Sequence, residues 1–162
     1  MTSHDPNDEP RPYASPVCYA HEFEQPPMTN GETIALLNTL LEGERAGAQG
    51  LNDLAKTCRD PSLAQLLRDV ARDEGRYCVM LRSHVKRLGG TPTDATGVFY
   101  EKLMAREGLA EQLRLLDRGQ SAVVKMIDAA LPRVADAMLR DDFVEMRETH
   151  LRNIARCAAV AV

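Results

Sequence analysis

Two glutamates stand alone in the middle of long stripes of apolar residues. Glu44 interrupts a stripe over residues 34–55 whose members alternate at spacings of three and four. Glu74 interrupts a similar stripe over residues 63–88. This spacing is typical of the buried face of an α-helix. Because a carboxylate on such a face is costly unless it is paired, hydrogen-bonded or bound to a metal ion, the two stripes predict a polar site inside a helical bundle.

A third glutamate and a histidine occupy comparable positions in the second half of the chain. Glu111 is the charged member of a stripe over residues 104–126, and His150 is the polar member of a stripe over residues 135–157. We therefore expect each of four helices to present one ionisable group to the core. Carboxylate oxygen and imidazole nitrogen suit iron, manganese and zinc, and bundle cores are where dinuclear carboxylate sites are built.

Local signals define the two helices that carry the first pair of glutamates. Thr29 and Glu32 form a capping box ahead of the first stripe. Asp60 and Pro61 supply an N-cap and a first-turn proline for the second helix, which is expected to end at the glycines of positions 89 and 90. The connection between the two helices is short, so they must pack antiparallel.

The remaining helices are less sharply bounded. Helical pattern over residues 98–131 predicts a third helix that could break at Gly108, and a fourth is expected over residues 133–160. The third helix has a second apolar stripe containing Gln120, which either hydrogen-bonds across the core or makes an ordinary interhelical contact. Residues 89–97 could barely span a full return along the bundle, so both parallel and antiparallel orientations of the second and third helices remain open.

Composition and charge exclude several classes of protein. The chain of 162 residues is 44% hydrophobic and 27% charged, as expected of one globular domain. Six of nine prolines and the whole net charge of −4 fall in residues 1–30, which predicts a disordered or extended acidic arm ahead of a neutral bundle domain over residues 31–162. No basic footprint for nucleic acid and no membrane-length apolar run is present. A cytoplasmic location is expected, because the first residues are unlike a signal peptide.

Short motifs along the four predicted helices carry a family resemblance. These motifs read LLNTLLEGERAGA, DEGRYC, LLDRGQ and ETHLRNI in chain order. The chain resembles the ferritin-like superfamily over roughly residues 18–158, in particular a bacterial branch of domains of unknown function. The resemblance implies an all-α, four-helix ferritin-like bundle. It also implies a di-iron pattern of a lone Glu, a Glu-x-x-His, a second lone Glu and a second Glu-x-x-His.

The sequence departs from that di-iron pattern at two positions. Glu44, Glu74, Glu111 and His150 match, which makes them the candidate metal ligands, for iron or manganese. Tyr77 stands where the first histidine is expected, and Arg147 stands three residues before His150 in place of a glutamate. A cation at a ligand position favours a metal-free alternative, in which Arg147 reaches one of the glutamates and Tyr77 donates a hydrogen bond to the same cluster.

Two functions from different classes follow from these residues. The first is a structural or stress-associated ferritin-like protein with an incomplete di-iron-type site and no cofactor, expected to form homo-oligomers. The second is a metal-dependent redox protein that uses a degenerate carboxylate and histidine site with iron or manganese. A third hypothesis assigns the arm of residues 1–30 to docking on a protein partner or a neighbouring subunit. The sequence names neither catalytic residues nor a substrate.

Overall fold

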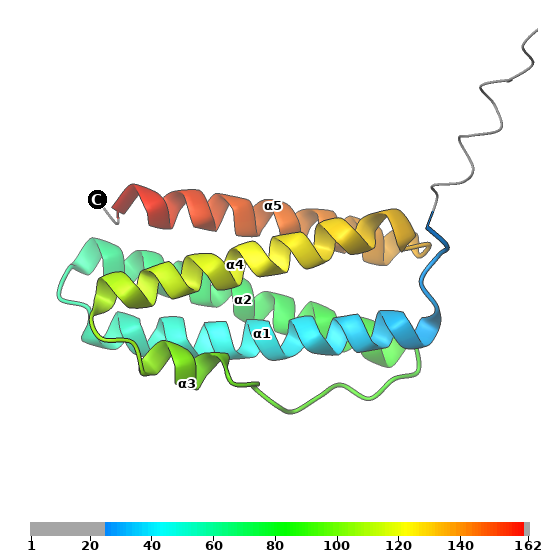
Figure 1. The fold of residues 1–162 in the computed structure, drawn as a ribbon, viewed down its shortest axis with the longest axis horizontal. Coiled ribbons are helices and arrows are strands. Elements are labelled where there is room, and N and C mark those ends of the chain that lie inside the picture. Colours follow the sequence, from blue (N-terminus) through cyan, green and yellow to red (C-terminus); the bar gives the residue numbers. More distant parts are fainter. Residues whose placement is uncertain (1–24, 161–162) are drawn as a thin grey trace, which may run out of the picture.

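The computed structural model describes residues 25–160, and all regular structure within that range is helical (Figure 1). Four long helices form a bundle, and a short helix and one 3₁₀ turn lie in its connections. The helices are α1 (Asn30–Thr57), α2 (Pro61–Arg87), α3 (Phe99–Met104), α4 (Leu109–Ala130) and α5 (Ala137–Val160), with the 3₁₀ turn η2 at Leu131–Arg133. The predicted all-α ferritin-like architecture is confirmed.

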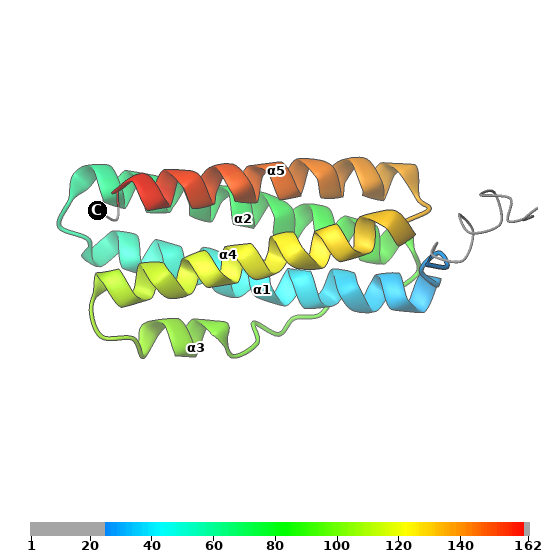
Figure 2. The same cartoon turned by 45° about the horizontal axis from the view of Figure 1, so that its top comes forward.

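The order of the helices in space resolves the topology that the sequence left open. α2 runs antiparallel to α1, and the chain then returns along the bundle before α4 begins, so that α2 and α4 run parallel (Figures 1 and 2). α5 runs antiparallel to α4. The return uses residues 88–98 and α3, which together make the long crossover that a ferritin-like bundle requires.

The first two helices begin as their capping residues predict. The Thr29 side chain accepts a hydrogen bond from the backbone of Glu32, whose carboxylate in turn accepts one from the backbone of Thr29. The Asp60 carboxylate accepts from Ser62 N at 2.8 Å, and Pro61 occupies the first helical position. These local signals fix the start of both helices that carry the buried glutamates.

A polar face of α1 holds the crossover segment, residues 88–98. Asn38 accepts a hydrogen bond from Thr93 N at 2.9 Å and donates one to Thr91 O at 3.1 Å. Arg45 donates to the carbonyl oxygens of Thr93, at 2.9 Å, and Ala95. Because the segment has no helix or strand of its own, side chains of α1 satisfy its backbone groups.

The third predicted helix is divided at Gly108. Gly108 has φ 82°, a left-handed conformation that favours glycine, and α4 begins directly after it. α3 packs on α1, where Leu103 is fully buried over Gly50 and Tyr100 donates a hydrogen bond to Asp53 at 2.8 Å. The break therefore separates a crossing helix from a core helix. At the other end, α5 begins at Ala137 rather than near residue 133, because Pro132 lies in the 3₁₀ turn and Asp136 caps the helix through Leu139 N.

Two apolar clusters fill the bundle and leave a polar layer between them. The first cluster includes Leu37, Leu41, Leu81, Ile127 and Phe143. The second lies toward the other end of α1 and includes Leu51, Leu54, Leu67, Val70 and Leu116. On each of α1, α2 and α4, the residues between these clusters include the side chains of the site described below, which therefore lies at mid-height in the bundle.

Most of the predicted N-terminal arm lies outside the described residues. Of the predicted arm of residues 1–30, residues 1–24 lie outside the described residues. Its boundary with the domain of residues 31–162 therefore stays a prediction. None of the described helices is both long enough and apolar enough to cross a membrane.

Candidate functional site

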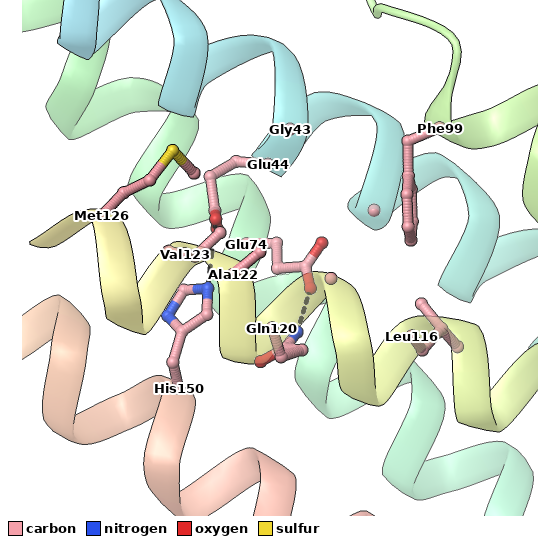
Figure 3. Close-up of a pocket in the computed structure, with 12 residues that line it drawn as sticks. Gly43, Glu44, Glu74, Phe99, Leu116, Gln120, Ala122, Val123, Met126 and His150 are labelled. Carbon is pink, nitrogen blue, oxygen red and sulfur yellow. Dashed lines mark hydrogen bonds and ion pairs between the residues drawn. The ribbon is translucent and has the colours of Figure 1, made fainter.

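Three of the four predicted ionisable groups meet in the middle of the bundle. Glu44 on α1, Glu74 on α2 and His150 on α5 are exposed by only 2%, 4% and 2%. Gln120, from α4, completes the cluster and is also buried (Figure 3). All four long helices therefore contribute one polar side chain to a single layer.

Glu44 and His150 form a buried hydrogen-bonded pair. Nε2 of His150 lies 3.0 Å from Oε1 of Glu44, and Nδ1 lies 2.9 Å from the carbonyl oxygen of Met146. A carbonyl can only accept, so Nδ1 carries a proton, and a second proton lies between Nε2 and the carboxylate. Burial lowers the pKa of His150, but the charge of Glu44 and these two hydrogen bonds outweigh it and raise the pKa. The direction of this shift and the two acceptors around the ring both favour the imidazolium form of His150.

Glu74 is held by an amide rather than by a cation. Nε2 of Gln120 donates a hydrogen bond to Oε1 of Glu74. Burial raises the pKa of Glu74 well above its usual value, and the nearby charge of Glu44 raises it further. The other carboxylate oxygen lies so close to Gly47 that a Cβ atom there would overlap it. Glycine at position 47 therefore makes room for the carboxyl group.

Three oxygen atoms of the cluster have no hydrogen-bond partner among the described residues. They are Oε2 of Glu44, Oε2 of Glu74 and Oε1 of Gln120, and all three are buried. Native proteins leave few such atoms, and each one calls for an explanation such as a water molecule, an ion or a ligand. These three atoms are the strongest sign that the layer holds something other than protein.

The prediction that Glu111 faces the core is wrong. Because α4 begins at Leu109, Glu111 lies in its first turn, where the side chain is exposed and pairs with Arg114. The core face of α4 includes Gln120, Val124 and Ile127 of the second apolar stripe, together with Leu116, Val123 and Ala130 beside it. Gln120 is thus the α4 residue that faces Glu74.

Neither residue at the replaced ligand positions contributes a polar atom to the cluster. The hydroxyl of Tyr77 donates to the carbonyl oxygen of Glu145 at 3.4 Å, while the tyrosine ring lies 5.8 Å from the ring of His150. Arg147 points away from the core and pairs with Asp128 on α4. The expectation that Arg147 compensates a buried glutamate is therefore wrong, since His150 supplies that charge.

A cavity of about 180 Å³ reaches the cluster from the surface between α1 and α4. At its floor lie Glu44, Glu74, Gln120 and His150. Its walls are almost entirely apolar and include Phe99, Leu116, Val123 and Met126 (Figure 3). Two exposed small residues, Gly43 and Ala122, line its outer part.

These residues do not fit a dinuclear metal centre. The di-iron pattern needs four carboxylates and two histidines, whereas this layer offers two carboxylates, one amide and one histidine. Among residues 25–160, no three histidine, cysteine, aspartate or glutamate side chains are arranged to hold a metal ion. The assignment of Glu44, Glu74, Glu111 and His150 as metal ligands stays a prediction, although Glu111 lies apart from the other three.

The sequence marks the charged members of the layer more clearly than two neutral ones. For Gln120 it predicts only a possible contact across the core, because an amide in an apolar stripe is a weaker signal than a carboxylate. Gly47 gave no signal of its own, since only the position of Glu74 shows why a side chain is excluded there. The two residues are paired with Glu74 through space and not through sequence spacing.

Comparison with known families and structures supports this architecture. A family described as Domain of unknown function (DUF6306) matches residues 31–159. No curated protein matches the sequence of this chain.

Two solved structures share the fold at low sequence identity. One is described as ferritin like, diiron-carboxylate proteins from Bacillus anthracis str. Ames, with a TM-score of 0.75 and 20% identity over 83% of this chain and 100% of that one. The other is a two-domain protein with DJ-1/ThiJ/PfpI-like and ferritin-like domains from Anabaena variabilis, with a TM-score of 0.66 and 18% identity over 83% of this chain and 37% of that one. At these identities the likeness establishes the fold alone.

Proposed function

Because the chain belongs to the DUF6306 family and has a ferritin-like fold, we propose that it is a metal-independent helical-bundle protein with a structural or stress-associated role. In this proposal a buried hydrogen-bonded cluster takes the place of a di-iron centre. The observation that carries it is the pair of Glu44 and His150, in which both imidazole nitrogens face an acceptor.

The charges of the cluster balance without a metal ion. The imidazolium of His150 offsets the carboxylate of Glu44, and burial together with Glu44 favours the protonated, neutral form of Glu74. The protons on His150 and Glu74 therefore neutralise the buried carboxylates, as two metal ions would in a complete site. A polar layer of this kind specifies how four helices align, because any other register would break the hydrogen bonds from His150 to Glu44 and from Gln120 to Glu74.

Elemental analysis of freshly purified, untagged protein tests this proposal. The protein is produced in medium supplemented with iron and manganese, and Glu44→Gln is analysed beside it. We expect far less than one metal ion per chain in both proteins, and the same thermal unfolding temperature with and without a chelator. One or two tightly held ions that disappear in the variant would refute metal independence.

A metal-dependent iron or manganese redox protein is the second candidate, and two observations favour it. Nδ1 of His150 bonds a backbone carbonyl, which is how metal-binding histidines are commonly oriented. In addition, Oε2 of Glu44 and Oε2 of Glu74 are buried without partners. The same elemental analysis decides between the two candidates, and peroxide consumption by the metal-loaded protein would then be the assay of its activity.

Three further properties belong to this proposal. We infer that the protein is cytoplasmic, that it forms homo-oligomers and that its partners do not include nucleic acid. The neutral charge of residues 31–162 supports the last point. Light scattering after size exclusion tests self-association, with a single-chain mass of 17.9 kDa as the result that would contradict it.

A further inference from the structure

The cavity between α1 and α4 joins two surfaces of opposite character. Its floor carries three buried oxygen atoms that lack a hydrogen-bond donor, on Glu44, Glu74 and Gln120. Its walls carry an aromatic ring, a thioether and two aliphatic side chains, from Phe99, Met126, Leu116 and Val123. A molecule that suits both surfaces must have a donor-rich head and an apolar body.

We propose that this cavity binds a small primary amine in its ammonium form, with the ammonium group on the polar floor and a short aliphatic or aromatic body against the walls. The proposal deepens the proposed function, because it requires a protein without a metal ion in the layer. It assigns the cavity as a binding site and adds no chemical step.

The number and kind of polar atoms favour an ammonium head. A primary ammonium has three N–H donors and no acceptor, and the floor offers three oxygen atoms without a partner among the described residues. A cation beside a carboxyl group favours its ionised form, so Glu74 releases its proton when the ammonium binds and its oxygens then accept. The imidazolium of His150 already faces Glu44 Oε1 and the Met146 carbonyl, so its donors are not available to the three oxygens. A carboxylate ligand would bring only further acceptors to a floor whose unpartnered atoms are all oxygens, which disfavours anions.

The walls and the volume limit the body of the ligand. About 180 Å³ exceeds the roughly 150 Å³ of an engineered apolar cavity that binds benzene, so one six-membered ring and a short linker can enter. Phe99 offers an aromatic face that attracts cations, and Met126 adds a soft, adaptable contact. A hydrated metal ion would gain nothing from these walls, whereas benzylamine or cyclohexylamine would bury its ring on them.

The entrance is formed by small side chains, which gives a way to close it. Ala122 is exposed and lines the outer part of the cavity, so Ala122→Phe fills the entrance without altering the floor. Ala129 lies on the same helix, is also exposed and does not line the cavity. Ala129→Phe is therefore the matched control for a new aromatic group on α4.

Calorimetric titration of the full chain with benzylamine at neutral pH tests the proposal, with benzyl alcohol and benzoate as matched ligands. We expect saturable binding of one amine per chain, at least tenfold weaker binding of the other two ligands, and loss of binding in Ala122→Phe but not in Ala129→Phe. Glu74→Gln, which keeps the shape of the side chain, is expected to weaken the amine at least tenfold and to leave benzyl alcohol unchanged.

Two results would overturn the proposal. One is the absence of saturable amine binding, and the other is binding of benzyl alcohol as tight as that of benzylamine. Elemental analysis of the same sample distinguishes failure of this inference from failure of the proposed function. A metal-free protein that does not bind benzylamine refutes this inference alone, whereas stoichiometric metal refutes the proposed function as well.

Discussion

The pairing of Glu44 with His150 can be measured by removing one partner and then both. His150→Leu leaves the Glu44 carboxylate in a site that is 2% exposed, where Oε1 loses its donor and Oε2 has none among the described residues. Breaking a buried ion pair in this way costs about 3–5 kcal/mol. Glu44→Leu strands the imidazolium, and we expect a loss of similar size.

The double change gives the decisive value. Glu44→Leu with His150→Leu removes both charges and puts two side chains of similar volume in their place, which for buried pairs is often neutral or stabilising. We therefore expect the double variant to be more stable than either single variant, with a coupling energy of several kcal/mol. In the double variant the carbonyl oxygen of Met146 loses its hydrogen bond from the ring of residue 150, but it keeps its hydrogen bond within the helix.

Urea unfolding followed by circular dichroism at neutral pH measures the free energy of unfolding of all four proteins. Arg147→Leu is the control, because Arg147 and Asp128 are 35% and 46% exposed and such a pair contributes at most about 1 kcal/mol. Additive losses in the double variant would refute the pairing as the structure describes it. A loss in Arg147→Leu as large as in His150→Leu would contradict its assignment to the surface.

Three further predictions concern the rest of the layer and the crossover. Glu74→Gln should gain stability relative to the wild type as pH rises, measured by urea unfolding from pH 5 to pH 8. A carboxyl group whose pKa is raised on folding stabilises the protein below its unfolded pKa. This contribution is lost as pH rises, by at most about 1.4 kcal/mol per pH unit. Parallel stability profiles of the variant and the wild type would contradict the buried, neutral form of Glu74. Gly47→Ala should destabilise the protein by about 1–3 kcal/mol, because the new Cβ meets the Glu74 carboxyl group. Gly43→Ala should stabilise it by up to about 1 kcal/mol, since nothing lies within 4 Å of a Cβ there. Equal effects of the two changes in thermal unfolding would be inconsistent with this packing. Arg45→Ala should speed amide hydrogen exchange across residues 91–98 while leaving α2 and α4 protected, and unchanged exchange there would show that Arg45 does not hold the crossover.

The helices that carry the buried glutamates could be predicted closely because their signals are local. The capping box at Thr29 and the Asp60-Pro61 pair act within one turn, and the stripes around Glu44 and Glu74 continue without a competing face. A lone carboxylate in such a stripe is also rare enough to mark a site. Both glutamates and His150 were therefore placed in the core correctly.

The third core helix was harder because two of its faces are apolar. The apolar stripe that contains Glu111 continues back across Gly108 in the sequence, and on that basis Glu111 is predicted to face the core. The left-handed backbone of Gly108 instead ends the helical pattern there. With α4 beginning at Leu109, the face containing Gln120 packs inward and Glu111 reaches solvent. Sequence spacing within one stretch cannot show this, because the choice depends on which face meets Glu74.

The partners of the replaced ligands depend on tertiary contacts in the same way. Arg147 was expected to compensate a buried glutamate, but the rotation of α5 that brings His150 to Glu44 directs Arg147 toward Asp128. Tyr77 is buried as expected, although its hydroxyl contacts a backbone carbonyl rather than the cluster. Residue types alone indicate an incomplete di-iron site, and the structure shows that His150 pairs with Glu44 inside it.

The protonation state of His150 decides whether protons or a metal ion occupy this layer. Nitrogen-detected NMR of the histidine side chains at neutral pH, assigned by comparison with His150→Leu, reports whether each ring nitrogen carries a proton. We expect protons on both Nδ1 and Nε2 of His150, since one faces the Met146 carbonyl and the other the Glu44 carboxylate. An Nε2 without a proton, in a protein that retains iron, manganese or zinc, would contradict the account and make this layer a metal site.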